Sequence, residues 1–384
     1  MTIDHEVTRR GLIGMGAGAL LAAPLAAAGR PDPVVRLIVG TYESEGGGGL
    51  YPLSYDPGRD SWALGAPLPT YANASFGAYD PRHDCHYLID EQSAGAVAEY
   101  RPGDPMRRVA MATGGADPCH IAIDPRHRRI AIAHYTDGGV AVIGIDPANG
   151  ALLGSPVVQT HTGFGPNARQ RGPHAHWVGF SPDGRWLHAV DLGADAVFGY
   201  ALSNGDLRSA IGQPIVSYRA PPGTGPRHMT LHPRRAQAFL LSELRSEVTV
   251  LDSAGGGRFV ARQTLSTLPA GFTGTNYPAE IAINRAGDRL YVSNRGHDSI
   301  AVFAVAADGR IDAIEHVATG GRWPRHFLLI EATKRLLVAN QRSGDVTALA
   351  IAADGRLRAT GASIAIPAPA FIARIPTKTI EGQP

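Results

Sequence analysis

One hairpin pattern recurs along most of this chain and constrains its fold more than any other feature. Its clearest copy is GPHAHWVGFSPDGRWLHAVDLG at residues 172–193, where two alternating segments flank the tetrapeptide SPDG. Proline sets φ at the second position of a tight turn and glycine tolerates positive φ, so this tetrapeptide favours a turn. The stretch therefore predicts a strand over Ala175–Phe180 and a second strand over Arg185–Val190.

The same hairpin returns at a regular interval. Further copies begin at Ala74, Pro118, Pro226, Pro278 and Pro324, so that with residue 175 as the landmark of the clearest copy the spacings run from 44 to 57 residues. Each interval has room for about four short strands, and such a period is typical of β-propellers. The predicted fold class is all-β, a β-propeller with four antiparallel strands in each blade.

The two ends of the chain predict how the ring closes. Three strands are expected over Arg36–Tyr42, Leu50–Tyr55 and Ser61–Leu68, without an innermost partner, whereas Ile364–Ala373 contains an innermost strand with nothing after it. If this C-terminal strand pairs with the N-terminal three, one shared blade closes the ring and leaves no open sheet edge. Six repeats and this blade predict a single seven-bladed domain over residues 34–376.

The first 29 residues have the pattern of an export leader. Paired arginines, Arg9 and Arg10, precede a Gly/Ala-rich apolar run that ends in three alanines at 26–28. This order indicates a secretory leader of the twin-arginine type. A membrane anchor is disfavoured, because Pro24 and the glycines interrupt a run that would need about 20 strongly apolar residues. We expect a periplasmic or secreted protein, with no stable membrane insertion once the leader is removed.

Composition excludes several other classes. The chain has 384 residues, 44% of them hydrophobic, with a formal net charge of +2. A core of useful size is expected, and no basic stripe interleaved with aromatics suggests nucleic-acid binding. The only two cysteines, Cys85 and Cys119, have no metal-site or disulfide spacing and are expected to be buried as small apolar groups. We expect a monomer without cofactor or metal.

The hairpin geometry locates a candidate site. The start of the first strand and the end of the second lie at the same end of an antiparallel hairpin, so each repeat brings two polar clusters to one mouth of the ring. The predicted groups are His174 and His176 with Asp191; Arg227 and His228 with Glu243; Glu280 with Asn294 and Arg295; Arg325 and His326 with Asn340 and Gln341; and, from the first two repeats, Asn73, Glu91, His120 and His134. A polar ring at a channel mouth predicts a small-molecule site.

Several stretches resemble one known family. GPHAHWVGFSPDGRWLHAVDLGAD from residue 172, PPGTGPRHMTLHP from 221, RLYVSNRGHDSIAVF from 289, and RWPRHF with LLVANQRSGDV from 322 and 336 are similar to the blade motifs of the seven-bladed propeller lactonases. That family includes one type of 6-phosphogluconolactonase and the carboxymuconate-lactonizing enzymes. The resemblance covers nearly the whole chain after the leader and implies a hydrolase that opens a sugar or organic-acid lactone.

The resemblance also implies roles for particular residues. A histidine, two arginines and a glutamate at the channel mouth are the family's suspected catalytic groups, and they match His176, Arg227, Glu243 and Arg295. Around them we expect substrate to be bound by His120, His174, His228, Glu280, Arg325, His326, Asn340 and Gln341. Glu243 or His176 can take a proton from water, while the arginines suit a developing oxyanion or a substrate carboxylate. No G-x-S-x-G occurs, which disfavours a nucleophile-elbow serine hydrolase.

Other interpretations stay open at this point. A lactonizing isomerase of the carboxymuconate type would use the same residues, and a non-catalytic binding propeller in the cell envelope would use the mouth as a contact surface. Glu243 with Arg227, and Glu280 with Arg295, can be ion pairs that only set the register of the blades. His174 and His176 alternate along one strand, which is also a metal-ligand arrangement. Ser242 and His134 depart from the asparagines usual in the family, and the leader disfavours a phosphorylated cytoplasmic substrate.

Overall fold

The repeated hairpin folds as its turn chemistry predicts. The strands β12 (Ala175–Phe180) and β13 (Trp186–Asp191) pair antiparallel, with Phe180 opposite Leu187. In the turn, Gly184 has a φ of 67° and its amide donates to the Ser181 carbonyl at 2.8 Å. A side chain at this φ would be strained, so glycine at this position keeps the turn tight.

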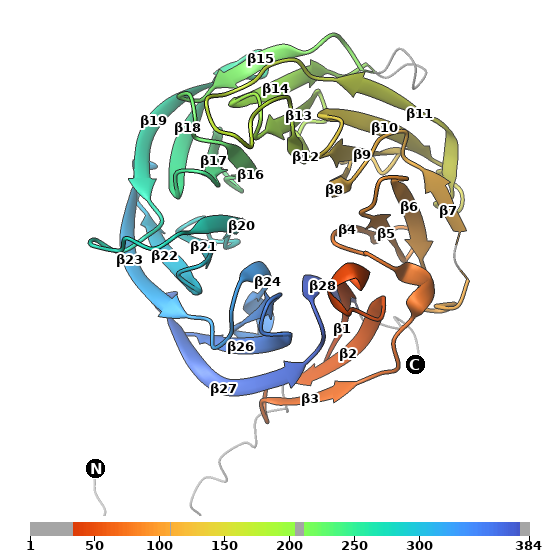
Figure 1. Cartoon of the computed structure of the whole chain (residues 1–384), viewed down its shortest axis with the longest axis vertical. Helices are drawn as coiled ribbons and strands as arrows, with labels where there is room; N and C mark the ends of the chain where they lie inside the picture. Colours follow the sequence, from red (N-terminus) through yellow and green to blue (C-terminus); the bar gives the residue numbers. More distant parts are fainter. Residues whose placement is uncertain (1–33, 108, 204–210, 377–384) are drawn as a thin grey trace, which may run out of the picture. The chain divides into compact units, whose positions relative to one another are not determined.

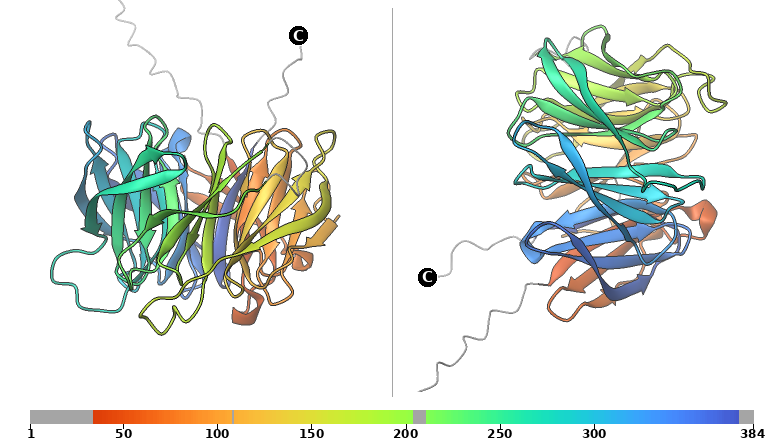
Figure 2. Two further views of the ribbon diagram at one scale, coloured as in Figure 1. Left: turned by 90° about the horizontal axis from the view of Figure 1, so that it is seen from above. Right: turned by 90° about the vertical axis from the view of Figure 1, so that its left-hand side faces the viewer.

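Seven such units lie around one axis as four-stranded sheets (Figure 1). This computed structural model describes residues 34–107, 109–203 and 211–376. Seen from the side, the strands of each blade run between the two faces of the ring (Figure 2). The predicted seven-bladed all-β propeller is therefore confirmed. The predicted leader, residues 1–29, lies outside the described residues.

Six of the sheets follow the order of the chain, and the first strand of each of these six is innermost in Figure 1. From the innermost strand outward the first three sheets are β4 (Gly77–Asp80), β5 (Cys85–Asp90), β6 (Ala96–Tyr100) and β7 (Val109–Ala112); β8 (Pro118–Ile123), β9 (Arg129–His134), β10 (Gly139–Ile145) and β11 (Leu152–Thr160); and β12 and β13 with β14 (Ala196–Ala201) and β15 (Ile215–Arg219). The next three are β16 (Pro226–Leu231), β17 (Gln237–Ser242), β18 (Glu247–Gly255) and β19 (Arg258–Ser266); β20 (Tyr277–Ile283), β21 (Arg289–Arg295), β22 (Ser299–Val305) and β23 (Ile311–Ala318); and β24 (Pro324–Ile330), β25 (Arg335–Asn340), β26 (Asp345–Ile351) and β27 (Leu357–Ala365).

The seventh blade joins the two ends of the chain. Its order is β28 (Pro369–Ile375), β1 (Val35–Thr41), β2 (Leu50–Asp56) and β3 (Ser61–Leu64), and β28 pairs antiparallel with β1. The predicted closure is thus confirmed, although β3 ends at Leu64, four residues before the predicted end. Short 3-10 turns η1 (Glu43–Glu45), η2 (Pro69–Tyr71) and η4 (Glu331–Thr333) are present, and none of the helices in the described ranges is long and apolar enough to cross a membrane.

Apolar clusters fill the interfaces between neighbouring blades. Seven clusters of buried side chains are present, and each draws its members from two adjacent sheets. For example, Leu37 and Val39 of the closing blade pack with Leu337 and Val346 of the blade before it. Burial of apolar area on both faces of every sheet is the main stabilising contribution in such a stack. The cysteines are free and buried, as expected.

A β-bulge recurs at the start of the innermost strand and shapes the candidate site. The register shifts between Pro118 and His120, Ala175 and Trp177, Pro226 and His228, Pro278 and Ile281, and Pro324 and His326. Three of these strands begin with proline and a fourth, β20, has proline as its second residue. Proline has no amide hydrogen for the ladder and so favours such an irregularity. A bulge re-aims the side chain at the extra residue, and here it re-aims Cys119, His176, Arg227 and Arg325.

Candidate active site

One buried carboxylate is bound by three guanidinium groups near the inner ends of the blades. Glu243, which follows β17, is 2% exposed. Its Oε1 lies 2.7 Å from Arg169 Nη1, and its Oε2 lies 2.8 Å from both Arg227 Nη1 and Arg295 Nη2. Charge-assisted contacts of this length are the strong class of hydrogen bond. Three cations around one anion leave the cluster with a net positive charge.

Each arginine is supplied by a different part of the ring. Arg227 is the bulged residue of β16 and its Nε donates to the Ala279 carbonyl at 2.9 Å. Arg295 ends β21 and its Nε donates to the Tyr277 carbonyl at 3.0 Å. Arg169 comes from the connection between β11 and β12, and its Nη2 donates to the Tyr135 hydroxyl at 3.2 Å. Because backbone carbonyls or a hydroxyl hold each side chain, the three cations are oriented before any ligand arrives.

His176 joins this cluster as a hydrogen-bond acceptor. Its Nε2 is in short contact with Arg227 Nη1, and its Nδ1 lies 3.7 Å from Cys119 Sγ. A guanidinium can only donate, so His176 Nε2 must accept and the ring proton belongs on Nδ1. Burial and the charge of Arg227 hold the pKa of His176 well below its usual range. His176 is therefore a neutral partner of Arg227.

The electrostatics keep Glu243 ionised. Burial alone raises its pKa, but Arg295, Arg227 and Arg169 outweigh burial and hold the pKa well below the usual carboxyl range. Burial also lowers the pKa of Arg295 to about 9, against the attraction of Glu243, which leaves Arg295 charged at neutral pH. Glu243 is thus a weak base whose charge holds the arginines together.

A second polar group lies on the side of the mouth near the closing blade. The Tyr42 hydroxyl donates to Glu91 Oε2 at 2.7 Å. Arg325 Nη2 lies 3.9 Å from the same oxygen, and the Arg325 guanidinium lies 4.9 Å from the centre of the Tyr42 ring. Among the described residues Arg325 makes one loose ion pair and a cation–π contact, so it keeps hydrogen-bond capacity for a ligand.

A second layer of side chains, most of them aromatic or imidazole rings, follows the bulged residues. Several neighbouring members are in contact, with ring centroids 4.2 Å apart for Phe76 and His120, 5.6 Å for His120 and Trp177, and 5.1 Å for His326 and Phe371. Glu280 Oε2 lies 3.3 Å from His228 Nδ1 and 3.8 Å from His326 Nε2. This lower tier consists of Phe76, His120, Trp177, His228, Glu280, His326 and Phe371.

The structure brings the four residues predicted as catalytic together, but several predicted pairings are wrong. Arg295 binds Glu243 and not Glu280, while the Asn294 amide donates to the Thr267 carbonyl at 2.8 Å. The ion pair of His228 is with Glu280, at 3.3 Å, and Glu243 acts on His228 only through its charge. The bulge at the start of each inner strand shifts the register of the hairpin by a residue, so residues expected to lie opposite one another do not.

Other predicted partners also have separate roles. Asn340 donates to Asp345 Oδ1 at 2.8 Å and Gln341 to Glu45 Oε1 at 2.8 Å, so neither meets Arg325 or His326. His174 contacts Asp191 only through its backbone amide, at 2.8 Å.

The rings of His174 and His176 both pack against the Tyr135 ring, at centroid distances of 4.6 and 5.4 Å. His174 Nδ1 donates to the Tyr135 carbonyl at 2.7 Å, and Asp191 Oδ2 is engaged by His161 at 2.7 Å. No cluster of three metal-ligand side chains occurs among the described residues.

Sequence reasoning missed Arg169 and Tyr42. Arg169 lies in a connection outside the repeat, where the Gln170 side chain donates to Asp195 Oδ1 and to the Leu192 carbonyl, both at 2.8 Å, and so holds the loop over the site. Tyr42 immediately follows β1. Neither residue lies at a position that recurs in the other repeats, and this recurrence was the signal that located the other site residues.

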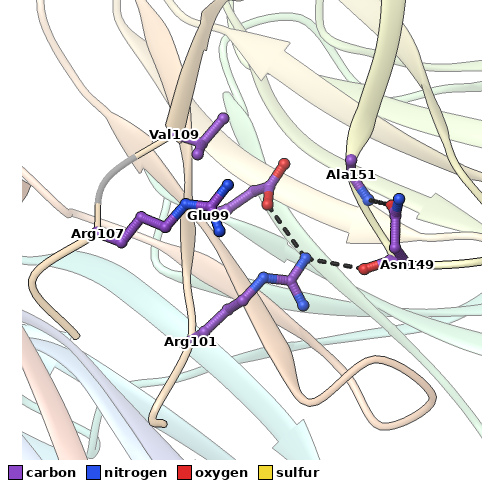
Figure 3. Close-up of a pocket in the computed structure, with 6 residues that line it drawn as sticks. All are labelled: Glu99, Arg101, Arg107, Val109, Asn149 and Ala151. Atoms are coloured by element: carbon purple, nitrogen blue, oxygen red, sulfur yellow. Dashed lines mark hydrogen bonds and ion pairs between the residues drawn. The ribbon is translucent and has the colours of Figure 1, made fainter. Parts of the chain in front are cut away.

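A pocket on the outer side of two blades is a poorer candidate. It is lined by Glu99, Arg101, Arg107, Val109, Asn149 and Ala151 (Figure 3). Arg101 Nη2 donates to Glu99 Oε2 at 3.1 Å and to the Asn149 carbonyl at 3.0 Å, and Glu99 Oε1 accepts from the Leu152 amide at 3.0 Å. These groups hydrogen-bond to one another across the two blades, so their role is to hold the two blades together.

Known proteins are similar to this chain along most of its length. A 6-phosphogluconolactonase from Bacillus subtilis is 33% identical over 289 residues, which cover 73% of this chain and 81% of that protein. The solved structure of a periplasmic gluconolactonase from Pseudomonas aeruginosa superposes with a TM-score of 0.81 at 28% identity, covering 89% of this chain and 99% of that one. A protein from Lactobacillus plantarum gives a TM-score of 0.81 at 29% identity, with coverage of 89% and 99%.

The sequence profile of one family matches almost the entire ring. The family is described as lactonase, 7-bladed β-propeller, and the match extends over residues 36–374. That range runs from the second residue of β1 to within two residues of the described C-terminus, so it includes every blade and the polar cluster around Glu243. This chain belongs to the lactonase family of seven-bladed β-propellers.

Proposed function

We propose that this chain hydrolyses a sugar or organic-acid lactone, in the manner of a 6-phosphogluconolactonase, at the polar mouth of the propeller. The observation that carries the proposal is the single carboxylate of Glu243 held by Arg169, Arg227 and Arg295 beside His176. A lactone is a cyclic ester, and attack by water places negative charge on its carbonyl oxygen. Pre-oriented cations in a buried site stabilise such an oxyanion most effectively.

In this proposal Arg227 and Arg295 bind the oxyanion or a carboxylate of the substrate. They suit this role because arginine keeps its charge at neutral pH and presents several donors in a fixed plane. Glu243 holds both guanidiniums in place, and His176 fixes the orientation of Arg227 through Nε2. The looser Arg325, near Glu91 and Tyr42, supplies a second anchoring point for the substrate.

We also propose that the protein is exported and acts as a monomer on an unphosphorylated lactone. The leader pattern with Arg9 and Arg10 supports export, and a structurally similar protein is a periplasmic gluconolactonase. Cell fractionation of the full chain tests this: replacement of both arginines by lysine should retain the protein in the cytoplasm. If the variant still reaches the periplasm, the twin-arginine assignment is contradicted. Light scattering of the mature chain tests whether the protein is a monomer.

Ring opening is tested with the mature chain, started at residue 30. Phosphorylated and unphosphorylated aldonolactones are followed by proton release, with Glu243→Gln and Arg227→Ala alongside. The matched control is Glu99→Gln, which removes a buried carboxylate paired with Arg101 on the outside of a blade. Turnover by the wild type and control, with loss in both site variants, supports the proposal. A folded wild type without turnover above the spontaneous rate refutes it and favours a lactonizing isomerase or a binding propeller.

A further inference from the structure

The residues assigned so far leave hydrolysis without a strong proton acceptor. Water becomes an effective nucleophile when a positioned lone pair takes its proton. Glu243 shares its charge among three guanidiniums, and the Nε2 lone pair of His176 accepts from Arg227. A general base in this site must therefore come from a side chain that the arginines do not engage.

His228 in the lower tier has such a lone pair. It directly follows Arg227 in β16 and is 3% exposed. Neither ring nitrogen has a hydrogen-bond partner among the described residues. Nδ1 faces Glu280, whose Oε2 lies 3.3 Å away, so Nε2 is the nitrogen left free for a ligand. A buried nitrogen left unpaired is costly for the fold, which is a reason to expect a ligand or a reacting group at that place.

The other two histidines of the lower tier differ from His228 in the partner of Nδ1. His120 Nδ1 accepts from the Val178 amide at 3.4 Å, and His326 Nδ1 accepts from the Ile372 amide at 3.3 Å. Each amide belongs to the inner strand of the next blade, one residue beyond the lower-tier position. At the equivalent place, the Ile281 amide donates to Glu280 Oε1 at 3.1 Å. Glu280 thus takes the amide that would fix His228 and presents a carboxylate oxygen to Nδ1 in its place.

His228 also lies beside the arginine cluster. Its ring centroid is 5.4 Å from that of His176, 5.2 Å from that of His120 and 6.0 Å from that of Phe76, so it makes contacts with three other blades. The charged or titratable groups that face it are Glu280, Glu243, Arg227, Arg295, Arg325, His120, His176 and His326. A proton taken up at Nε2 would remain next to the cations that bind the oxyanion.

We propose that His228 is the general base of lactone opening and that Glu280 positions it; this inference rests on the proposed function. With the ring proton on Nδ1 facing Glu280, Nε2 takes a proton from water while the water oxygen bonds to the lactone carbonyl carbon. The carbonyl oxygen becomes an oxyanion against Arg227 and Arg295. The bond from that carbon to the ring oxygen then breaks, the ring oxygen receives the proton from Nε2, and the product is the open hydroxy acid.

The surroundings favour the neutral form of His228 before reaction. Burial and the charges of Arg227 and Arg325 hold the pKa of His228 well below its usual range, and burial raises the pKa of Glu280. Neutral imidazole is the form that accepts a proton. As pH falls, His228 and Glu280 together bind a second proton, and the free lone pair on Nε2 is lost. The curve of activity against pH should therefore fall on its acid side, which we call the acid limb. Removing the Glu280 carboxylate should move that limb to lower pH, because the carboxylate favours protonation of the pair.

The test compares His228→Gln and Glu280→Gln in the mature chain with the wild type. The matched control is His86→Gln, since His86 is also fully buried with both ring nitrogens unpartnered among the described residues, on β5 between Tyr79 and Tyr100. We expect kcat for glucono-δ-lactone to fall about 100-fold or more in both site variants with little change in KM. We also expect an acid limb at lower pH for Glu280→Gln, and wild-type kinetics for the control.

The two proposals fail in different ways. A folded wild type without ring opening refutes the proposed function and removes the basis of this inference. An active wild type in which Glu243→Gln and Arg227→Ala lose activity, but His228→Gln stays within about threefold of the wild type, refutes the role of His228 alone. An unmoved acid limb in Glu280→Gln refutes the positioning role. If His228→Gln does not fold, His228→Ala assayed with free imidazole replaces it: a recovered rate supports the base, and a folded variant without recovery overturns it.

Discussion

Replacement of Glu243 by glutamine should destabilise the propeller by an amount that depends on pH. The carboxylate lies within 2.8 Å of Arg227 and Arg295, whose side chains are 5% and 6% exposed. Removal of the anion leaves two buried cations without compensation, and breaking such a buried pair costs about 3–5 kcal/mol. Arg169 is 39% exposed at its side chain and adds little, because solvent screens it.

The expected shift can be measured by thermal unfolding. For a ring of this size each kcal/mol lowers Tm by about 2 °C or less, so Glu243→Gln should unfold roughly 5–10 °C below the wild type at neutral pH. Glu99→Gln is the control: the side chain of its partner Arg101 is 30% exposed, so the loss should be at most about 1 kcal/mol.

The pH dependence gives the sharper test. The three arginines hold the pKa of Glu243 well below its usual value in the folded state. A depressed pKa contributes stability that is fully present above the unfolded value and is lost as pH falls toward the folded one. The Tm difference between wild type and variant should therefore be constant above about pH 5 and shrink below about pH 4. Equal Tm values at neutral pH, or a difference that grows on acidification, would refute this account of the cluster.

Three further outcomes are expected. Arg169→Gln should raise KM more than it lowers kcat, with a smaller loss of Tm than Glu243→Gln, because the side chain is half-exposed and Glu243 keeps two other partners; an unchanged KM would contradict a role in substrate binding. Truncation after residue 366 removes β28 and should yield aggregated or unfolded protein by size-exclusion chromatography and circular dichroism, since β1 loses its inner partner. Gly193→Ala should lower stability by about 1–3 kcal/mol because its methyl group would overlap the Gly172 carbonyl oxygen, whereas Gly172→Ala meets no atom and should unfold like the wild type.

Much of the fold was predictable because the information is local and repeated. A turn such as the one at Gly184 needs only its own residues, and six copies of it reveal a period. Ring closure followed from counting strands at the two ends of the chain. The third N-terminal strand was placed too long because Leu68 forms only an isolated bridge, to Leu50, beyond the end of β3.

The pairings in the candidate site were less predictable because they depend on contacts between blades. Extending the pairing of Ile281 with Val292 by one residue would place Glu280 opposite Ser293, and beyond the bulge Arg295 lies opposite Tyr277, so the hairpin itself does not pair Glu280 with Arg295. Arg295 then reaches Glu243 of the preceding blade. Proline at or near the start of most inner strands was the available signal for a bulge, although it does not indicate which neighbour a re-aimed side chain will meet. Arg169 gave no signal, since its loop has no counterpart in other repeats.

The closing blade has a consequence for the order in which the protein is made. β1, β2 and β3 leave the ribosome first, but β28, their inner partner, leaves it last. During synthesis the first blade therefore has an unpaired inner edge along β1, while the blades that follow can each form their own four strands. Glu91 and Arg325, contributed by the first and last of these blades, can meet only when the circle is complete. The mouth can therefore be completed only after β28 has been synthesised and has paired with β1.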